Sequence, residues 1–348
     1  MAVEETSEHW DKHVERVEAH TLKGWLDWEY LEREYFRPQI SGDPDVYYLH
    51  HFINQHLPNS PVPRALSLGC GGGNLERALI QLGAAQMIDA YDVSKESIRL
   101  AKQMAEEVGL QDRIHYEVRN INKIELPPKT YDFVIIKMAL HHFEQLEHVY
   151  AQIAQSLTDD GVLVFNEFIG ASRFQWTDQQ LGLMNELIRV LPDKHRWSVW
   201  AQQELGGIER PTLAHMIAMD TSEAVRSAEI MPRLKDHFEI VEYKPYGGTL
   251  MHMLLTHIMG TFDLENPEEE ALLKLLLLHE KTLIQHGVIG SDFAYVVAQP
   301  IGSKPRARIG EPPPIQEATR LRVPLNQMVI GRLHWVLHRV KAWLKQLQ

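Results

Sequence analysis

The sequence predicts an α/β fold in which a seven-stranded, mostly parallel sheet carries helices on both faces. Three observations predict it. A short apolar run at 65–69 leads into a glycine-rich turn and a helical pattern, short apolar runs and helical patterns then alternate as far as residue 168, and two more strand-like runs follow later. Strands that alternate with helices form parallel sheets, because each crossover connection needs a helix to return the chain.

The glycine-rich turn follows the first predicted strand. Gly69, Gly71 and Gly73 form the pattern G-x-G-x-G, and Asn74 stands where a dinucleotide-binding fingerprint has its last glycine. Glycines at the end of a strand permit positive φ and let a ligand approach the backbone closely. The helix that follows offers free N–H groups to the same ligand. The turn therefore indicates a nucleotide site without the dinucleotide signature.

Asp92 ends the second predicted strand, about twenty residues after the turn. A carboxylate at this position can accept hydrogen bonds from both hydroxyls of a ribose. The alternative interpretation is an acid at the start of a helix, with Ser94 as the better candidate for the helix cap.

The remaining elements follow from hydrophobic periodicity and from turn residues. We expect strands at 65–69, 86–92, 113–118, 131–136, 162–168, 238–243 and 293–298, and helices at 74–82, 95–108, 144–157 and from Asn266 to His286. The predicted domain organisation is an N-terminal helical lid at 1–63, a central domain at 64–300 with helical inserts at about 171–236 and 249–291, and a proline-containing linker with a basic amphipathic helix at 301–348.

Composition limits the class of partner. The 348 residues carry a formal net charge of −12, and the last 46 contain nine Lys and Arg against two Glu, so residues 1–302 carry −19. So acidic a body repels phosphate backbones, which argues against nucleic acid as a partner. The single cysteine, Cys70, the polar N-terminus and the absence of a long apolar run favour a cytoplasmic protein.

The C-terminal segment has a different character. Its apolar residues are spaced as a heptad stripe, and basic residues with two tryptophans flank the stripe within 322–348. Two interpretations stay open: a helix that lies on the inner face of an anionic membrane, and a helix that docks onto the acidic body or onto a partner. The sequence does not predict an oligomeric state.

Four segments in order resemble the class I S-adenosylmethionine-dependent methyltransferases. They are Leu66–Asn74, Tyr91–Ser94, Tyr131–Ile136 with Ala139–His142, and Leu157–Leu163. The resemblance implies a Rossmann-like fold, S-adenosyl-L-methionine as cofactor, and methyl transfer as the activity. A looser similarity downstream links the chain to bacterial methyltransferases that act on small molecules or glycans.

The resemblance also implies a set of cofactor-binding residues. Gly69 and Gly71 would face the methionine part of the cofactor, Asp92 would hold the ribose, and Cys70 and Asn74 belong to the same turn. The adenine ring would meet Asn120 through its amide and would lie between Val93 and Ile121, and Lys137 would contribute its backbone near the sulfonium.

Methyl transfer from a sulfonium needs alignment of the nucleophile, and a hydroxyl nucleophile benefits from a base. His141, His142 and Glu167 follow the fourth and fifth predicted strands, where a base would have to lie, although the histidine pair also suits a structural role. Arg173 and Arg226 are candidates for binding an acidic substrate or for ion pairs.

No metal site is expected. The sequence has neither H-E-x-x-H nor paired cysteines, and His50 and His51 fall in what reads as a surface helix. The sequence therefore predicts a methyltransferase that acts on a small molecule or glycan, at an oxygen nucleophile. The alternatives are an N- or C-methyltransferase of the same fold, and a non-catalytic cofactor-binding scaffold recruited through its C-terminal helix.

Overall fold

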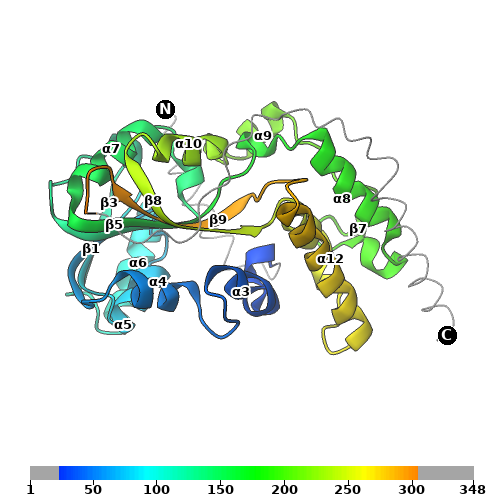
Figure 1. The fold of residues 1–348 in the computed structure, drawn as a ribbon, viewed down its shortest axis with the longest axis horizontal. Helices are drawn as coiled ribbons and strands as arrows, with labels where there is room; N and C mark the ends of the chain where they lie inside the picture. The colour runs from blue at the N-terminus through cyan, green and yellow to red at the C-terminus, as the bar shows by residue number, and fades with distance from the viewer. Residues whose placement is uncertain (1–22, 305–348) are drawn as a thin grey trace.

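The computed structural model describes residues 23–304, which form a seven-stranded sheet with helices on both faces (Figure 1). The strand order is β3-β2-β1-β4-β5-β9-β8. The strands are β1 Val62–Leu68, β2 Ala85–Asp92, β3 Ile114–Val118, β4 Tyr131–Lys137, β5 Leu157–Phe168, β8 Phe238–Gly247 and β9 Phe293–Pro300. The β5–β9 and β9–β8 pairs are antiparallel, and the other pairs of this sheet are parallel. The predicted α/β class and the mostly parallel seven-stranded sheet are thus confirmed.

Two hydrophobic cores lie on opposite faces of the sheet. On one face, Phe133 and Ile135 of β4 belong to a core with α4 Tyr48–His56, α5 Asn74–Gln81 and α6 Lys95–Glu107. On the other face, the alternate residues Val134 and Ile136 belong to a core with α7 Leu146–Ser156 and α10 Ile230–Leu234. Burial of both faces explains why the central strands read as continuous apolar runs.

The remaining elements connect or extend these layers. The helical segments are η1 Trp25–Asp27, α2 Glu29–Leu31, the π-helical η2 Glu32–Phe36, α3 Arg37–Ile40, η3 Ile121–Lys123, η4 Leu140–His142, η5 Ser172–Phe174, α8 Asp178–Val190, η6 Asp193–Arg196, α9 Leu213–Met219, η7 Ser227–Glu229, α11 Met251–Ile258, η8 Met259–Thr261 and α12 Pro267–Gln285. A two-stranded hairpin, β6 Trp197–Ser198 and β7 Gln203–Glu204, interrupts the first insert, which the sequence predicts as helical.

Local capping signals place the helix starts. The Ser94 hydroxyl accepts a hydrogen bond from the Ser97 N–H at 3.0 Å, which makes Ser94 the cap of α6. The Asn266 side chain accepts from the Glu268 N–H at 2.9 Å, and Pro267 occupies the first position of α12. Both predicted helix starts are therefore confirmed.

One buried carboxylate fastens the second insert to the rest of the domain. Glu280 of α12 is fully buried and accepts hydrogen bonds from the backbone N–H groups of Gly248, Leu250 and Met251 at 2.7–2.9 Å. It also accepts from the Tyr35 hydroxyl at 2.7 Å. The N-terminal segment, the start of α11 and α12 therefore meet at this side chain.

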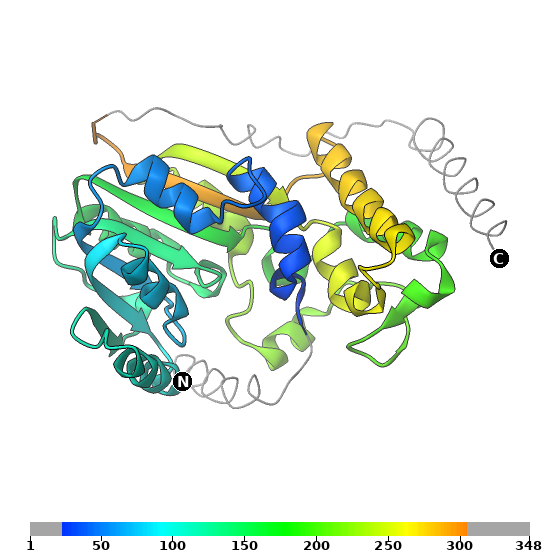
Figure 2. The ribbon, with the colours of Figure 1, turned by 90° about the horizontal axis from the view of Figure 1, so that it is seen from below.

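Helix α4 has one face buried against the sheet and one face exposed. Tyr48, Leu49, Phe52 and His56 are buried and His50 is exposed, so the interpretation as a surface helix holds for His50 but is wrong for His51, which is mostly buried. Figure 2 shows α4 and the N-terminal segment lying along the β4–β9 region. None of the helices in residues 23–304 is both long and apolar enough to cross a membrane. The expectations for 1–22 and for the C-terminal helix at 322–348 lie outside the described residues.

Candidate active site

The turn after β1 opens onto a cavity at the carboxyl end of the sheet. Gly69 has φ +72°, and a Cβ there would lie 2.4 Å from the Cβ of Ala139. Gly71 has φ +50°, and a Cβ there would have no neighbour within 4 Å. The first glycine is thus needed for close packing against the loop after β4, and the second leaves room beside the backbone for a ligand.

Asp92 is held in a fixed orientation beside this turn. Its Oδ2 accepts a hydrogen bond from the Gly71 N–H at 2.9 Å, and its Oδ1 accepts from the Ser94 N–H at 2.9 Å. Because two backbone groups orient it, the carboxylate presents a preformed acceptor at the wall of the cavity.

The cavity has a volume of about 410 Å³, which is within the usual range for small-molecule sites. Nine of the expected site residues line it: Gly69, Cys70, Gly71, Asp92, Val93, Asn120, Ile121, Lys137 and His142. The acidic, amide and apolar groups on its wall fit the ribose and adenine of the cofactor that the resemblance implies. Asn74, His141 and Glu167 do not line it.

Asn74 and Asn120 both act as local hydrogen-bond acceptors. The Asn74 side chain accepts from the Arg77 guanidinium one turn later in α5, which directs it away from the cavity. The Asn120 Oδ1 accepts from the Asn122 N–H at 3.0 Å and caps η3. An amide oxygen has two lone pairs, so Asn120 keeps the capacity to accept a second hydrogen bond at the cavity wall.

Cys70 is buried, and burial together with the nearby carboxylates of Glu76 and Asp92 raises the pKa of its thiol. A protonated thiol is a poor nucleophile. Cys70 is therefore a wall residue of the cavity.

His141 and Glu167 are paired beneath the loop after β4. Glu167 is fully buried, contacts His141 Nδ1, and accepts hydrogen bonds from the N–H groups of Ala139 at 2.8 Å and Leu140 at 2.7 Å. Burial lowers the pKa of His141, but the carboxylates of Glu167, Glu223 and Asp220 together outweigh burial and raise that pKa to about 9. A protonated imidazole cannot accept a proton near neutral pH, and Glu167 is occupied by the loop. Glu167 and His141 thus hold the loop after β4, and the catalytic role expected for them stays a prediction.

His142 has a different environment from its neighbour. Its side chain lines the cavity, and its Nδ1 lies 3.1 Å from the Ser222 hydroxyl and 3.8 Å from Asp220 Oδ2. Of the three catalytic candidates from the sequence, His142 is the one beside the cavity.

A second cavity, of about 380 Å³, adjoins the first. Lys137 and Met138 line both cavities and form the boundary between them. Met138 has φ +49°, a conformation that is uncommon for a residue with a side chain. Aromatic and charged side chains make up most of the second wall, among them Trp28, Glu32, Phe36, Arg37, Tyr47, Tyr48 and Tyr246, and the amide of Asn166 adds a neutral polar group.

Little in the sequence points to the residues of the second cavity. Glu32 and Arg37 precede Gly69, the first glycine of the turn after β1, by more than thirty positions, and Tyr246 follows Gly69 by more than 170. The one signal is the concentration of aromatic and charged residues before the first strand. The sequence predicts only a backbone role for Lys137, yet its side chain lies 6.0 Å from the Tyr48 ring in the second cavity.

The two arginine candidates, Arg173 and Arg226, both bind groups of the protein. Arg173 lines the first cavity and donates hydrogen bonds to the carbonyls of Asp220, Thr221 and Glu223. Arg226 forms ion pairs with Glu147 and Glu229.

The fold and the glycine turn with its acidic second strand define a nucleotide-binding α/β domain. The sequence model of a family described as "Methyltransferase domain" matches residues 61–228. The chain is 27% identical to 27-O-demethylrifamycin SV methyltransferase of Amycolatopsis mediterranei over 115 residues, which are 32% of this chain and 41% of that protein. It is 26% identical to sterol 24-C-methyltransferase ERG6B of Gibberella zeae over 123 residues, or 34% of this chain and 31% of that protein.

Residues 61–228 therefore form a class I S-adenosylmethionine-dependent methyltransferase domain. The chain spans less than half the length of these two relatives. Among solved structures, geranyl diphosphate C-methyltransferase from Streptomyces coelicolor A3(2) aligns with 86% of this chain and 98% of its own, at 14% identity and a TM-score of 0.48.

Proposed function

We propose that this protein transfers a methyl group from S-adenosyl-L-methionine to an oxygen of a small molecule or glycan bound in the second cavity. The observation that carries the proposal is the boundary at Lys137 and Met138, which brings a second, polar and aromatic cavity against the cofactor cavity. The named relatives act on acceptors as different as a sterol and a rifamycin, so the acceptor has to be inferred from the cavity itself.

The second cavity suits a polar acceptor with a flat or ring-shaped body. Trp28, Tyr47 and Tyr246 offer aromatic surfaces, while Glu32, Arg37 and Lys137 offer charged hydrogen-bonding groups. Aromatic faces pack against rings and the charged groups fix hydroxyls in place. Sugars and phenols combine these two properties.

Glu32 is the side chain that best suits a general base for the acceptor. It lines the second cavity, and its Oε1 lies 3.3 Å from Arg37 Nε. Burial raises the pKa of Glu32, although Arg37 and Lys137 oppose the shift. A raised pKa makes a carboxylate a better proton acceptor near neutral pH. The cofactor supplies an electrophilic methyl group, and Glu32 would take the proton that the acceptor hydroxyl loses.

The other site residues have supporting roles in this proposal. Asp92 orients the ribose, Val93 and Ile121 enclose the adenine, and the loop held by Glu167 fixes the boundary between the two ligands. His142 borders the cofactor cavity and is the second candidate for the base.

Calorimetric titration with S-adenosyl-L-methionine and, separately, with NAD tests the cofactor assignment. We expect binding of the first and not of the second, and we expect Asp92→Ala to abolish it because the ribose loses its acceptor. Asp112→Ala, which changes an exposed acid, is the matched control. Binding of NAD, or unchanged affinity in Asp92→Ala, would contradict the assignment.

Release of S-adenosylhomocysteine with a panel of hydroxylated sugars and phenols tests the acceptor class. We expect Glu32→Gln to lower kcat by roughly 100-fold or more and to leave the affinity for S-adenosyl-L-methionine unchanged. Glu34→Gln, on the same helical segment but exposed, serves as control. If only amine acceptors react, the oxygen assignment fails. If no acceptor reacts although the cofactor binds, the scaffold alternative gains support.

A further inference from the structure

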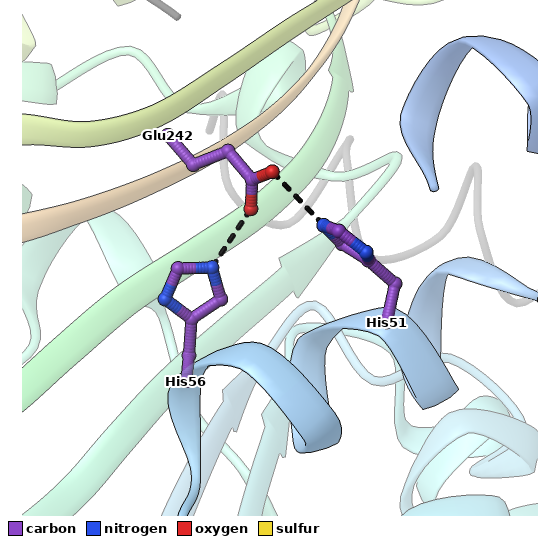
Figure 3. Close-up of side chains that lie close together, drawn as sticks. All are labelled: His51, His56 and Glu242. Atoms are coloured by element: carbon purple, nitrogen blue, oxygen red, sulfur yellow. Dashed lines mark hydrogen bonds and ion pairs between the residues drawn. The ribbon is translucent and has the colours of Figure 1, made fainter. Parts of the chain in front are cut away.

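A cluster of two histidines and one glutamate lies outside both cavities, between α4 and β8. His51 Nε2 is 2.9 Å from Glu242 Oε1, and His56 Nε2 is 2.7 Å from Glu242 Oε2. Figure 3 shows both imidazoles directed from α4 toward the one carboxylate on β8. The exposed fractions are 11% for the His51 side chain, 4% for His56 and 0% for Glu242.

We propose that His51, His56 and Glu242 bind a zinc ion. Two imidazole nitrogens and a carboxylate are one of the standard donor sets for this metal. One ligand atom from each residue can be chosen so that all lie within 4.8 Å of one another. Zinc ligands at about 2.0–2.2 Å from the metal in tetrahedral geometry are roughly 3.4 Å apart. The imidazole nitrogens now lie 2.9 and 2.7 Å from the two oxygens of Glu242, so they have to move about 0.5 and 0.7 Å farther from the carboxylate.

The surroundings are prepared for a further ligand atom. Tyr295 of β9 packs its ring 5.8 Å from the His51 ring, and its hydroxyl is buried without a hydrogen-bond partner among residues 23–304. An unpartnered buried hydroxyl is costly in a folded protein unless a ligand or water satisfies it. Three protein ligands leave the fourth coordination position of zinc open. The Tyr295 hydroxyl would find a partner there, either as a ligand itself or through a water bound to the metal.

Lys244 is the one cationic competitor beside these ligands in the part of the chain that the structure describes. Its Nζ lies 3.8 Å from Glu242 Oε1, and its side chain is 30% exposed, so it can turn into solvent when a dication arrives. Removing this charge is therefore expected to strengthen metal binding.

Zinc at this position would link α4, which contributes to the wall of the second cavity, to the sheet. Helix α4 begins at Tyr48, which lines that cavity, and ends at His56. The metal would therefore stabilise α4 without contacting the cofactor. The proposed site does not depend on the identity of the reaction.

Titration of the full chain with ZnCl₂ after removal of bound metal tests the proposal. We expect about one zinc per chain, and loss of at least 100-fold in affinity in both His51→Gln and Glu242→Gln. His50→Gln, the neighbouring exposed histidine of the same helix, should bind zinc like the wild type. Lys244→Met should bind it several-fold more tightly.

Two further measurements distinguish zinc bound at this cluster from zinc bound elsewhere in the chain. His142→Gln tests the second His-rich cluster, at His141, His142 and Glu223, and should leave zinc binding intact. Cobalt(II) substitution should give the intense visible absorption of a tetrahedral site in the wild type and not in Glu242→Gln. Titration with S-adenosyl-L-methionine shows that the variants at His50, His51, Glu242 and Lys244 are folded, and a thermal unfolding curve shows it for His142→Gln, because His142 borders the cofactor cavity.

Absence of zinc binding in the wild type would overturn the proposal. Equal affinity in the wild type and His51→Gln would overturn it too, because the metal would then lie elsewhere. If zinc binds and the melting temperature rises in the wild type and in His50→Gln but not in Glu242→Gln, the site is established.

Discussion

At the scale of single residues, the cofactor cavity depends on two glycines, which have no side chain. Gly69 packs its Cα against Ala139, while Gly71 faces open space at the cofactor cavity. The same residue type, two positions apart, thus serves packing in one case and ligand access in the other.

The paired substitutions Gly69→Ala and Gly71→Ala separate these roles. Gly69→Ala is expected to lower the free energy of unfolding by about 2–4 kcal/mol, from left-handed strain and from the clash with Ala139. Gly71→Ala is expected to cost only about 1–2 kcal/mol but to weaken cofactor binding at least tenfold, because its methyl group enters the cavity. Denaturant unfolding and calorimetric titration measure the two effects. Wild-type affinity in Gly71→Ala would show that the cofactor does not pass this residue.

Residues of this kind are predictable from the sequence because their signal is local. The turn at Gly69 and Gly71 and the acid at Asp92 lie within one strand-helix-strand unit, and hydrophobic periodicity places its ends. Glu32 and Glu242 are not predictable as site residues. Each acquires its neighbours through tertiary packing of segments far apart in the chain, and no spacing in the sequence encodes such a contact.

At the scale of elements, the loop after β4 is set by a buried ion pair. Glu167 receives two backbone N–H groups of the loop and the His141 imidazole. The sequence places both side chains correctly at strand ends, but it cannot show that they satisfy each other, since that depends on the depth of burial.

This ion pair predicts a pH dependence of stability. The folded-state pKa of His141 is raised from 6.5 to about 9, so its stabilising contribution is complete below pH 6.5 and is lost as pH rises toward 9. The unfolding free energy of the wild type should fall by about 2–3 kcal/mol over this window. In His141→Gln this part of the decline should be absent, whereas His115→Gln, at an exposed position, should behave like the wild type. Urea unfolding at several pH values gives the comparison, and parallel curves for wild type and His141→Gln would refute it.

At the scale of the whole molecule, two buried acids work against stability at neutral pH. Burial raises the pKa of Asp292 from 3.8 to about 7, and that of Glu76 from 4.5 to about 7. Both residues are buried in the folded protein, so ionisation is penalised there and not in the unfolded chain.

Replacement of Asp292 by Asn removes one of these penalties. The raised pKa means that the stability present below pH 4 is lost as pH rises to about 7, so Asp292→Asn should be more stable than the wild type above pH 7, by about 2–4 kcal/mol. Near pH 4 the two should unfold alike. Melting curves at pH 4 and pH 8 test this, with Asp112→Asn as the exposed control. A variant less stable than the wild type at pH 8 would contradict the prediction.

The carboxylate of Glu280 has a consequence for how ligands reach the protein. Because it accepts hydrogen bonds from the Tyr35 hydroxyl and the Gly248 N–H, moving the second insert away from the N-terminal segment would break both bonds. The N-terminal segment that lines the second cavity is therefore anchored at Tyr35, so the wall formed by Glu32 and Phe36 is expected to be in place before an acceptor arrives.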